Sequence, residues 1–114
     1  MHELAVCQAL VAQSIDIAQQ HAALGVAVIR LHIGPLSGVE PALLQSAFPL
    51  AAAGTLAAAA QLVITPQPVR VRCKTCGADS EATPNRLLCG VCGDYHTQLV
   101  SGDEMLLVNL ELIT

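Results

Sequence analysis

Apolar side chains recur every three or four residues along the first part of the chain, which is the period of one face of an α-helix. The members of this stripe are Leu4, Cys7, Leu10, Val11, Ile15, Ile17 and Ala18. The pattern predicts an amphipathic helix that ends near His21, because Gly25 breaks the period soon afterwards. From residue 28 the period changes to two, with Ile29, Leu31 and Ile33 on one face and Val28, Arg30 and His32 on the other. This alternation predicts a strand with one face on a core.

A second helix and a second strand are predicted between residues 41 and 65. Pro41 suits the first turn of a helix, and Gly54 would end it. The residues expected to anchor this helix are Leu43, Leu44, Ala47, Phe48 and Ala51. Pro49 cannot donate a hydrogen bond to the carbonyl group of Gln45, so we expect a kink or an early stop there. Residues 61–65 are typical of a strand that Pro66 ends.

The chain changes character between residues 67 and 102, where four of its five cationic side chains and four of its five cysteines are found. Residues 105–113 return to a strand pattern, with Leu106, Val108, Leu110 and Leu112 on one face. A strand this apolar needs a sheet to join, and the nearest predicted sheet lies in the first half of the chain. We therefore expect one domain of residues 1–66 and 103–114, and a small module of residues 67–102 inserted into it.

Charge and hydropathy argue against a membrane location and against nucleic-acid binding for this chain of 114 residues. Residues 41–69 carry no charged side chain, but Pro49, Gly54 and Pro66 interrupt them, so no apolar stretch reaches the ~18 residues of a membrane span. The N-terminus lacks the basic and apolar segments of a signal peptide, so we expect a cytoplasmic protein without a membrane partner. The net charge of −4 also disfavours binding to nucleic acid.

Two CxxC pairs form the strongest local signal in the sequence. Cys73 and Cys76 are separated by twelve residues from Cys89 and Cys92, and glycines at 77, 90 and 93 would let backbone amides turn toward the sulfur atoms. Four thiolates make a closed tetrahedral zinc site with no open position, which is structural rather than catalytic. A redox dithiol or an iron–sulfur cluster is the alternative, but the βαβ setting of a redox motif is missing.

The first three residues offer a second, weaker metal site. The amino group of Met1, the deprotonated amide nitrogen of His2 and the His2 imidazole can bind one ion through fused chelate rings. Such nitrogen-rich, tetragonal sites suit Ni(II) or Cu(II). Glu3 would add an oxygen ligand or merely complement the positive N-terminal end of the helix. Taken alone, a histidine at position 2 is usually accidental.

The remaining candidate ligands are weaker still. Cys7 lies on the apolar stripe, so a buried packing role is expected. His21 should bond carbonyl groups at the end of its helix, and His32 should lie on the solvated face of its strand. His96, four residues after Cys92, is either an exposed loop residue or a ligand of a second metal site beside the cysteines. Phosphate loops, nucleophile elbows and acid/base pairs are missing from the sequence, so we do not expect an enzyme.

A rival hypothesis treats the cysteine module as a zinc ribbon that binds nucleic acid. Arg70, Arg72 and Lys74 would then contact phosphates, or an acidic partner, instead of forming a solvated edge. The rival predicts salt-dependent binding to polynucleotides. With one Phe, one Tyr and no Trp, however, the chain has little to stack on bases.

These pieces, in this order, resemble the HypA/HybF family of hydrogenase/urease nickel incorporation proteins over nearly the whole chain. The segments that carry the resemblance are Met1-His2-Glu3-Leu4, Cys7-Gln8, Leu31-His32-Ile33-Gly34-Pro35-Leu36-Ser37, Val39-Glu40-Pro41, Phe48, Gly54-Thr55-Leu56-Ala57, the four paired cysteines and Gly102-Asp103-Glu104-Met105. The combination is highly specific, and it makes His2 an expected nickel ligand.

The resemblance implies a nickel metallochaperone with an α+β fold, in which two helices lie on a three-stranded sheet and a zinc-ribbon-like module is inserted before the last strand. It implies exchangeable Ni(II) at Met1, His2 and Glu3, and structural Zn(II) at the four paired cysteines. The implied partners are the maturation GTPase HypB and the precursor of the [NiFe]-hydrogenase large subunit, with urease maturation proteins as further candidates. The chain would act as a monomer or a homodimer.

The sequence also departs from the family pattern. Pro49 replaces the usual acidic residue after the phenylalanine, and the run of alanines at 57–60 lacks an expected acidic residue and glycine. Asn109 stands where a basic residue is common. None of these positions is a metal position, so the departures bear on the second helix and on partner surfaces near residues 49–60.

Overall fold

The computed structural model describes residues 2–114, which divide into two compact units. The elements in chain order are α1 (Glu3–Gln20), β1 (Gly25–Ile33), α2 (Pro41–Ala52), β2 (Gln61–Pro66), β3 (Val69–Cys73), β4 (Asp79–Ala82), β5 (Thr97–Ser101) and β6 (Met105–Ile113). The first unit holds the chain up to Leu31, Val39–Thr65 and Leu107–Thr114. The second holds His32–Gly38 and Pro66–Leu106. The expected α+β fold is confirmed, and among the described residues no helix is long and apolar enough to cross a membrane.

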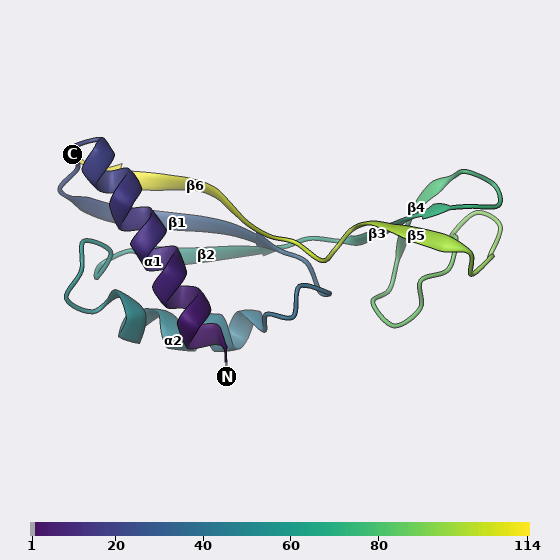
Figure 1. The fold of residues 1–114 in the computed structure, drawn as a ribbon, viewed down its shortest axis with the longest axis horizontal. Helices are drawn as coiled ribbons and strands as arrows, with labels where there is room; N and C mark the ends of the chain where they lie inside the picture. The colour runs from purple at the N-terminus through teal and green to yellow at the C-terminus, as the bar shows by residue number, and fades with distance from the viewer. Residues whose placement is uncertain (1) are drawn as a thin grey trace. The chain divides into compact units, whose positions relative to one another are not determined.

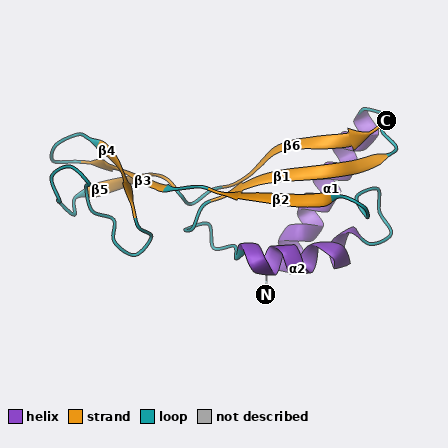
Figure 2. Cartoon of the chain, turned by 180° about the vertical axis from the view of Figure 1, so that it is seen from behind, coloured by secondary structure: helices purple, strands orange, loops and turns teal. Residues whose placement is uncertain are grey.

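The first unit is built on a three-stranded sheet in the order β2-β1-β6. The last strand therefore returns to the sheet of the first half, as its apolar pattern predicts. Helix α1 crosses one face of this sheet (Figures 1 and 2). The predicted inner face of β1 is confirmed, because Ile29, Leu31 and Ile33 are buried while the residues between them are only partly buried.

The buried face of α1 is displaced from the predicted stripe. Leu4 is 39% exposed, whereas Ser14 is fully buried in line with Cys7 and Val11. Ser14 tolerates burial because its hydroxyl group donates to the carbonyl oxygen of Leu10 at 2.8 Å. The predicted end of the helix is confirmed, and the ring nitrogen Nδ1 of His21 lies 3.1 Å from the carbonyl oxygen of Ile17.

Helix α2 begins at Pro41 as expected and continues past Pro49 to Ala52, so no early stop occurs. Its buried side chains are Leu44, Phe48 and Ala52, one on each successive turn. Leu43, predicted as an anchor, is 51% exposed because it lies one position away from this stripe.

The predicted apolar face of β6 is wrong over half of its length. Leu106 and Val108 are exposed, while Leu110 and Leu112 are partly buried, so the alternation changes phase near the middle of the strand. The guanidinium group of Arg30 on β1 donates to the side chain of Asn109 at 3.0 Å and to the carboxylate of Glu111. These two polar residues lie on the outer face of the sheet with Arg30, which turns Leu110 and Leu112 to the other face.

The second unit contains an antiparallel sheet in the order β4-β3-β5. Val69, Val71 and Cys73 of the central strand are buried. Residues 32–38 belong to this unit although we expected them with the helices. Their backbone explains why: the Ile33 carbonyl accepts from the amide of Gln67 at 3.0 Å, and the Gly34 amide donates to the Glu104 carbonyl at 2.9 Å.

The backbones of Gly34 and Gly102 lie in close contact in this second unit. A Cβ atom on Gly34 would overlap the carbonyl oxygen of Gly102, and Gly102 itself has a φ of 120°. Both positions therefore require glycine, one for space and the other for its backbone conformation. They belong to two of the segments that carry the family resemblance, LHIGPLS and GDEM.

Candidate metal centres

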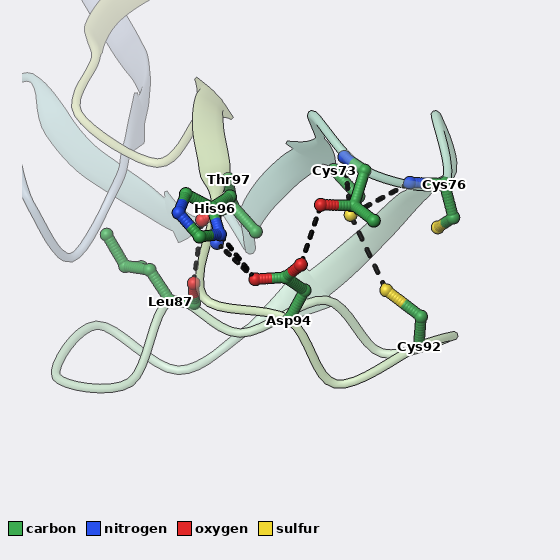
Figure 3. Close-up of polar contacts among 8 residues, drawn as sticks. Cys73, Cys76, Leu87, Cys92, Asp94, His96 and Thr97 are labelled. Carbon is green, nitrogen blue, oxygen red and sulfur yellow. Dashed lines mark hydrogen bonds and ion pairs between the residues drawn. The ribbon is translucent and has the colours of Figure 1, made fainter.

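The four paired cysteines come together in the second unit. Figure 3 shows three of them, Cys73, Cys76 and Cys92. Their sulfur atoms all lie within 4.8 Å of one another. The sulfur atoms of Cys73 and Cys92 are 3.6 Å apart, as are those of Cys76 and Cys89. The first cysteine of each CxxC pair is buried and the second is exposed. Residues that are sixteen positions apart thus form one compact set of four donors.

Each CxxC pair forms a tight turn that we call a knuckle: residues 73–78 are the first knuckle and residues 89–94 the second. In each knuckle, the backbone amides two and three residues after the first cysteine point at the sulfur atom of that cysteine. The donors are Thr75 and Cys76 to Cys73 at 3.3 Å, and Val91 and Cys92 to Cys89 at 3.4 Å. This is the arrangement expected around thiolates, because such donors stabilise negative charge on sulfur.

The predicted role of glycine is confirmed at two of the three positions. Gly77 and Gly93 both have a φ of 78°, and each donates its amide to the carbonyl of the first cysteine of its knuckle at 3.0 Å. That backbone conformation favours glycine. Gly90 has a different role, since its amide donates to the hydroxyl oxygen of Ser80 at 2.9 Å.

The thiols of the cluster cannot all ionise without a cation among them. The amides of Cys92 and Val91 lower the pKa of the Cys89 thiol to about 6. Despite an amide from Asp94, the pKa of Cys92 is raised to about 12, because its proton is shared with the sulfur of Cys73. Four thiolates this close repel one another strongly, and a bound divalent ion relieves that repulsion. The donor set therefore fits a soft divalent ion such as Zn²⁺.

Asp94, which the sequence did not single out, is bonded to several groups beside the cluster (Figure 3). Its Oδ2 accepts from the hydroxyl of Thr75 at 2.6 Å. Its Oδ1 accepts from the backbone amide of His96 at 3.0 Å and lies 2.7 Å from the ring nitrogen Nδ1 of His96. The Thr75 hydroxyl first, and then the two His96 groups, hold the pKa of Asp94 well below its usual range. The only signal in the sequence is the place of Asp94, two residues after Cys92.

His96 lies at the edge of the cysteine module, but it is not part of the four-sulfur group. Its side chain is 55% exposed and its Nδ1 is engaged by Asp94. Its ring is also close to that of Tyr95, with 4.1 Å between the ring centroids. The structure therefore places His96 on the outside of the cluster, and a second metal site there stays a prediction.

At the N-terminal end, the structure describes two of the three predicted nickel ligands, and Met1 lies outside the described residues. The His2 side chain is 57% exposed, and its Nε2 is 3.6 Å from Oε2 of Glu3. Glu3 is buried, and the same Oε2 accepts from the backbone amide of Glu40 at 3.3 Å. Glu3 thus connects the start of α1 to the start of α2, a contact that the sequence pattern did not predict.

Three other expectations concern residues outside these centres. Cys7 is buried as predicted, its thiol donates to the carbonyl oxygen of Leu44 at 3.4 Å, and burial raises its pKa. His32 is partly buried on β1 rather than fully solvated. Arg72 forms a double hydrogen bond with Asp79, at 2.7 and 3.1 Å, so this member of the basic edge is already paired with an acid of its own module.

A family model described as "Hydrogenase/urease nickel incorporation, metallochaperone, hypA" matches residues 1–112. The chain belongs to this family. Among the curated proteins, the hydrogenase maturation factor HypA of Nitrosospira multiformis is 47% identical over 114 residues, covering 100% of this chain and 99% of the relative. The HypA of Aquifex aeolicus is 39% identical over 112 residues, covering 98% of this chain and 97% of the relative. The resemblance inferred from the sequence is therefore confirmed.

Solved HypA structures have the same fold. The solution structure of the Ni metallochaperone HypA from Helicobacter pylori has a TM-score of 0.70 and 27% identity, covering 99% of this chain and 98% of that one. A second solution structure of a HypA protein has a TM-score of 0.75 and 26% identity, covering 99% and 97%. The chain thus belongs to a family of nickel metallochaperones for hydrogenase and urease.

Proposed function

We propose that this chain binds Ni(II) at its N-terminus and delivers it, together with the GTPase HypB, for assembly of the [NiFe]-hydrogenase active site. The observation that carries the proposal is the match of residues 1–112 to the HypA family combined with an exposed His2 at the start of α1. Urease is a second recipient consistent with the family description. The recipient protein would be the large-subunit precursor of the hydrogenase.

The proposed nickel ligands are Met1, His2 and Glu3. Nickel(II) favours nitrogen donors in a tetragonal arrangement, which a terminal amine, an amide nitrogen and an imidazole can supply. The positive end of the α1 dipole disfavours a cation, but the Glu3 carboxylate, 3.6 Å from the His2 ring, offsets this effect. Exposure of His2 leaves the ion accessible to a recipient protein, as transfer of a metal cargo requires.

The proposed role of the four-cysteine cluster is to hold structural Zn(II). Its donor set has no open position for a substrate, and the unit around it buries few large apolar side chains. The ion would hold the two knuckles and the sheet of β3, β4 and β5 together. Free thiols in this number suit a reducing compartment, so we place the protein in the cytoplasm.

A nickel titration of the untagged chain tests the proposal. We expect one nickel ion per chain in the native protein, and a loss of affinity of at least tenfold both in His2→Ala and in a variant with one extra N-terminal residue. His21→Ala is the matched control, since His21 is an exposed histidine at the other end of the same helix. If the native, His2→Ala and extended chains bind nickel equally well, the N-terminal site is wrong.

A further inference from the structure

The two knuckles have the same backbone design. In each, the amide of the first cysteine donates to the carbonyl five residues later, from Cys73 to Ala78 and from Cys89 to Asp94, both at 2.9 Å. Ala78 and Asp94 therefore occupy equivalent positions. Alanine has no polar side chain, whereas aspartate carries a carboxylate that can reach the other knuckle.

The carboxylate of Asp94 does reach across. Its Oδ2 accepts the hydroxyl of Thr75, which lies between the two cysteines of the first knuckle, at 2.6 Å. The backbone adds a parallel contact, because the amide of Lys74 donates to the carbonyl of His96 at 2.8 Å. The segment that follows Cys92 is thus joined to the turn that follows Cys73 by two hydrogen bonds that involve no sulfur atom.

His96 determines which oxygen atom is available for this contact. Its backbone amide and its ring nitrogen Nδ1 both meet Oδ1, at 3.0 and 2.7 Å. With Oδ1 engaged in this way, Oδ2 is directed at Thr75. The Asp94 side chain is 25% exposed, so its hydrogen bond to Thr75 is partly shielded from competing water.

We propose that Asp94 is a positioning residue of the four-cysteine site, which ties the second knuckle to the first through Thr75 and so keeps the bound metal from escaping. The proposal rests on the proposed metal binding at the four cysteines. It assigns Asp94 no contact with the ion itself.

The tie acts on the rate of metal loss. Loss of an ion held by all four cysteines would require the sulfur atoms of both knuckles to move away from it. A bond between the knuckles keeps the released sulfur atoms close, which raises their effective concentration and favours rebinding. Without the tie the knuckles separate more readily, and the ion departs more often.

The test is the rate at which the zinc-loaded, full-length chain gives up its metal to an excess of a chromogenic chelator at neutral pH. Thr75→Val removes the hydroxyl group and keeps the side-chain shape, and Asp94→Ala removes the carboxylate. Because each deletes the same charge-assisted hydrogen bond, we expect each to speed zinc release about tenfold. The double variant should be no faster than the faster single variant, since the two residues act through one bond.

Two control variants distinguish loss of the Asp94–Thr75 hydrogen bond from other effects of a substitution on zinc release. Asp79→Asn deletes a comparable carboxylate contact, to Arg72, which directly flanks the first knuckle but does not join it to the second, and should change the rate less than twofold. His96→Ala keeps the backbone amide that holds Oδ1, and should change the rate less than threefold. The ¹⁵N chemical shifts of the His96 ring provide a separate readout: Asp94→Ala should abolish the Nδ1–H signature, and Thr75→Val should preserve it.

The outcomes are distinct. Unchanged release from both Thr75→Val and Asp94→Ala, or additive effects of the two, would overturn the proposal. So would a His96→Ala variant that releases zinc as fast as Asp94→Ala, because the carboxylate would then act through His96. Zinc content is measured before each experiment. A native chain that does not hold one zinc ion would refute the proposed zinc site itself. A native chain that holds zinc, with variants that release it at the native rate, would refute only the proposed role of Asp94.

Discussion

The two candidate metal centres hold their donor atoms in opposite ways. At the four-cysteine cluster, backbone amides point at the sulfur atoms of Cys73 and Cys89, and bonds outside the donor set connect the knuckles. At the N-terminal end, the His2 side chain is 57% exposed and makes no capping hydrogen bond at the start of α1. A donor set fixed by its surroundings favours retention of an ion, while an exposed one favours exchange. The difference agrees with the proposed roles, in which the cluster retains its metal and the N-terminal site passes its metal on.

The largest difference between the two metal centres is expected when one cysteine of the cluster is removed. In Cys73→Ser we expect loss of the zinc ion and unfolding of the β3, β4 and β5 sheet, because a structural zinc site contributes about 10 kcal/mol or more to folding. The first unit should keep its own core and its nickel binding. Amide NMR spectra, recorded with metal analysis, would show the loss of dispersed signals from residues 69–101 alone.

Cys7→Ala is the matched control for that experiment. It also removes one buried thiol, but from α1. Zinc content should therefore stay at the native level. Retention of zinc and of a folded second unit in Cys73→Ser would mean that the cluster is not the centre of structural stability.

A smaller effect is expected from Glu3→Gln, which keeps the size and the hydrogen-bond acceptor of the side chain but removes its charge. A carboxylate 3.6 Å from the His2 ring attracts a divalent ion bound there, so its loss should weaken nickel binding about tenfold. Zinc binding should not change. Competition titrations with a nickel chelator measure the difference.

Glu40→Gln is the control, since it removes the same charge from an exposed side chain while leaving intact the backbone amide that bonds Glu3. Equal nickel affinity in the Glu3→Gln variant and the native chain would show that Glu3 acts only in the contact between α1 and α2.

The smallest effect concerns pH at the cluster. Between pH 7 and pH 5 zinc release should speed up in every variant, because the thiolates take up protons; even Cys89, whose pKa is lowered to about 6, becomes protonated in this window when the metal leaves. Asp94 has a depressed pKa in the folded chain, so its contribution is present above its unfolded value of about 4 and is lost only below that.

The ratio of release rates between Thr75→Val and the native chain should therefore stay constant within about twofold from pH 7 to pH 5. Stopped-flow measurements at several pH values would show it. A ratio that falls toward one by pH 5 would contradict the ionised Asp94 that the hydrogen bonds indicate.

Much of the fold was predictable because local patterns carry it. The period of three or four residues located α1, the alternation at Ile29, Leu31 and Ile33 located β1, and Pro41 marked the start of α2. The buried faces were predicted less well. Ser14 is buried and its hydroxyl donates to the carbonyl of Leu10 in its own helix, and Leu106 and Val108 of β6 are exposed although Leu110 and Leu112 are partly buried. Periodicity within one segment holds no information on the segments that pack against it.

By itself the sequence determined which residues could hold metal, since donor chemistry and spacing are local properties: two CxxC pairs, and a histidine at position 2. Only the tertiary structure decided how those donors are supported. Asp94 meets Thr75 across nineteen positions, and Glu3 meets Glu40 across thirty-seven. Contacts of this kind depend on how the chain returns on itself, so they become visible only when the whole fold positions the two segments.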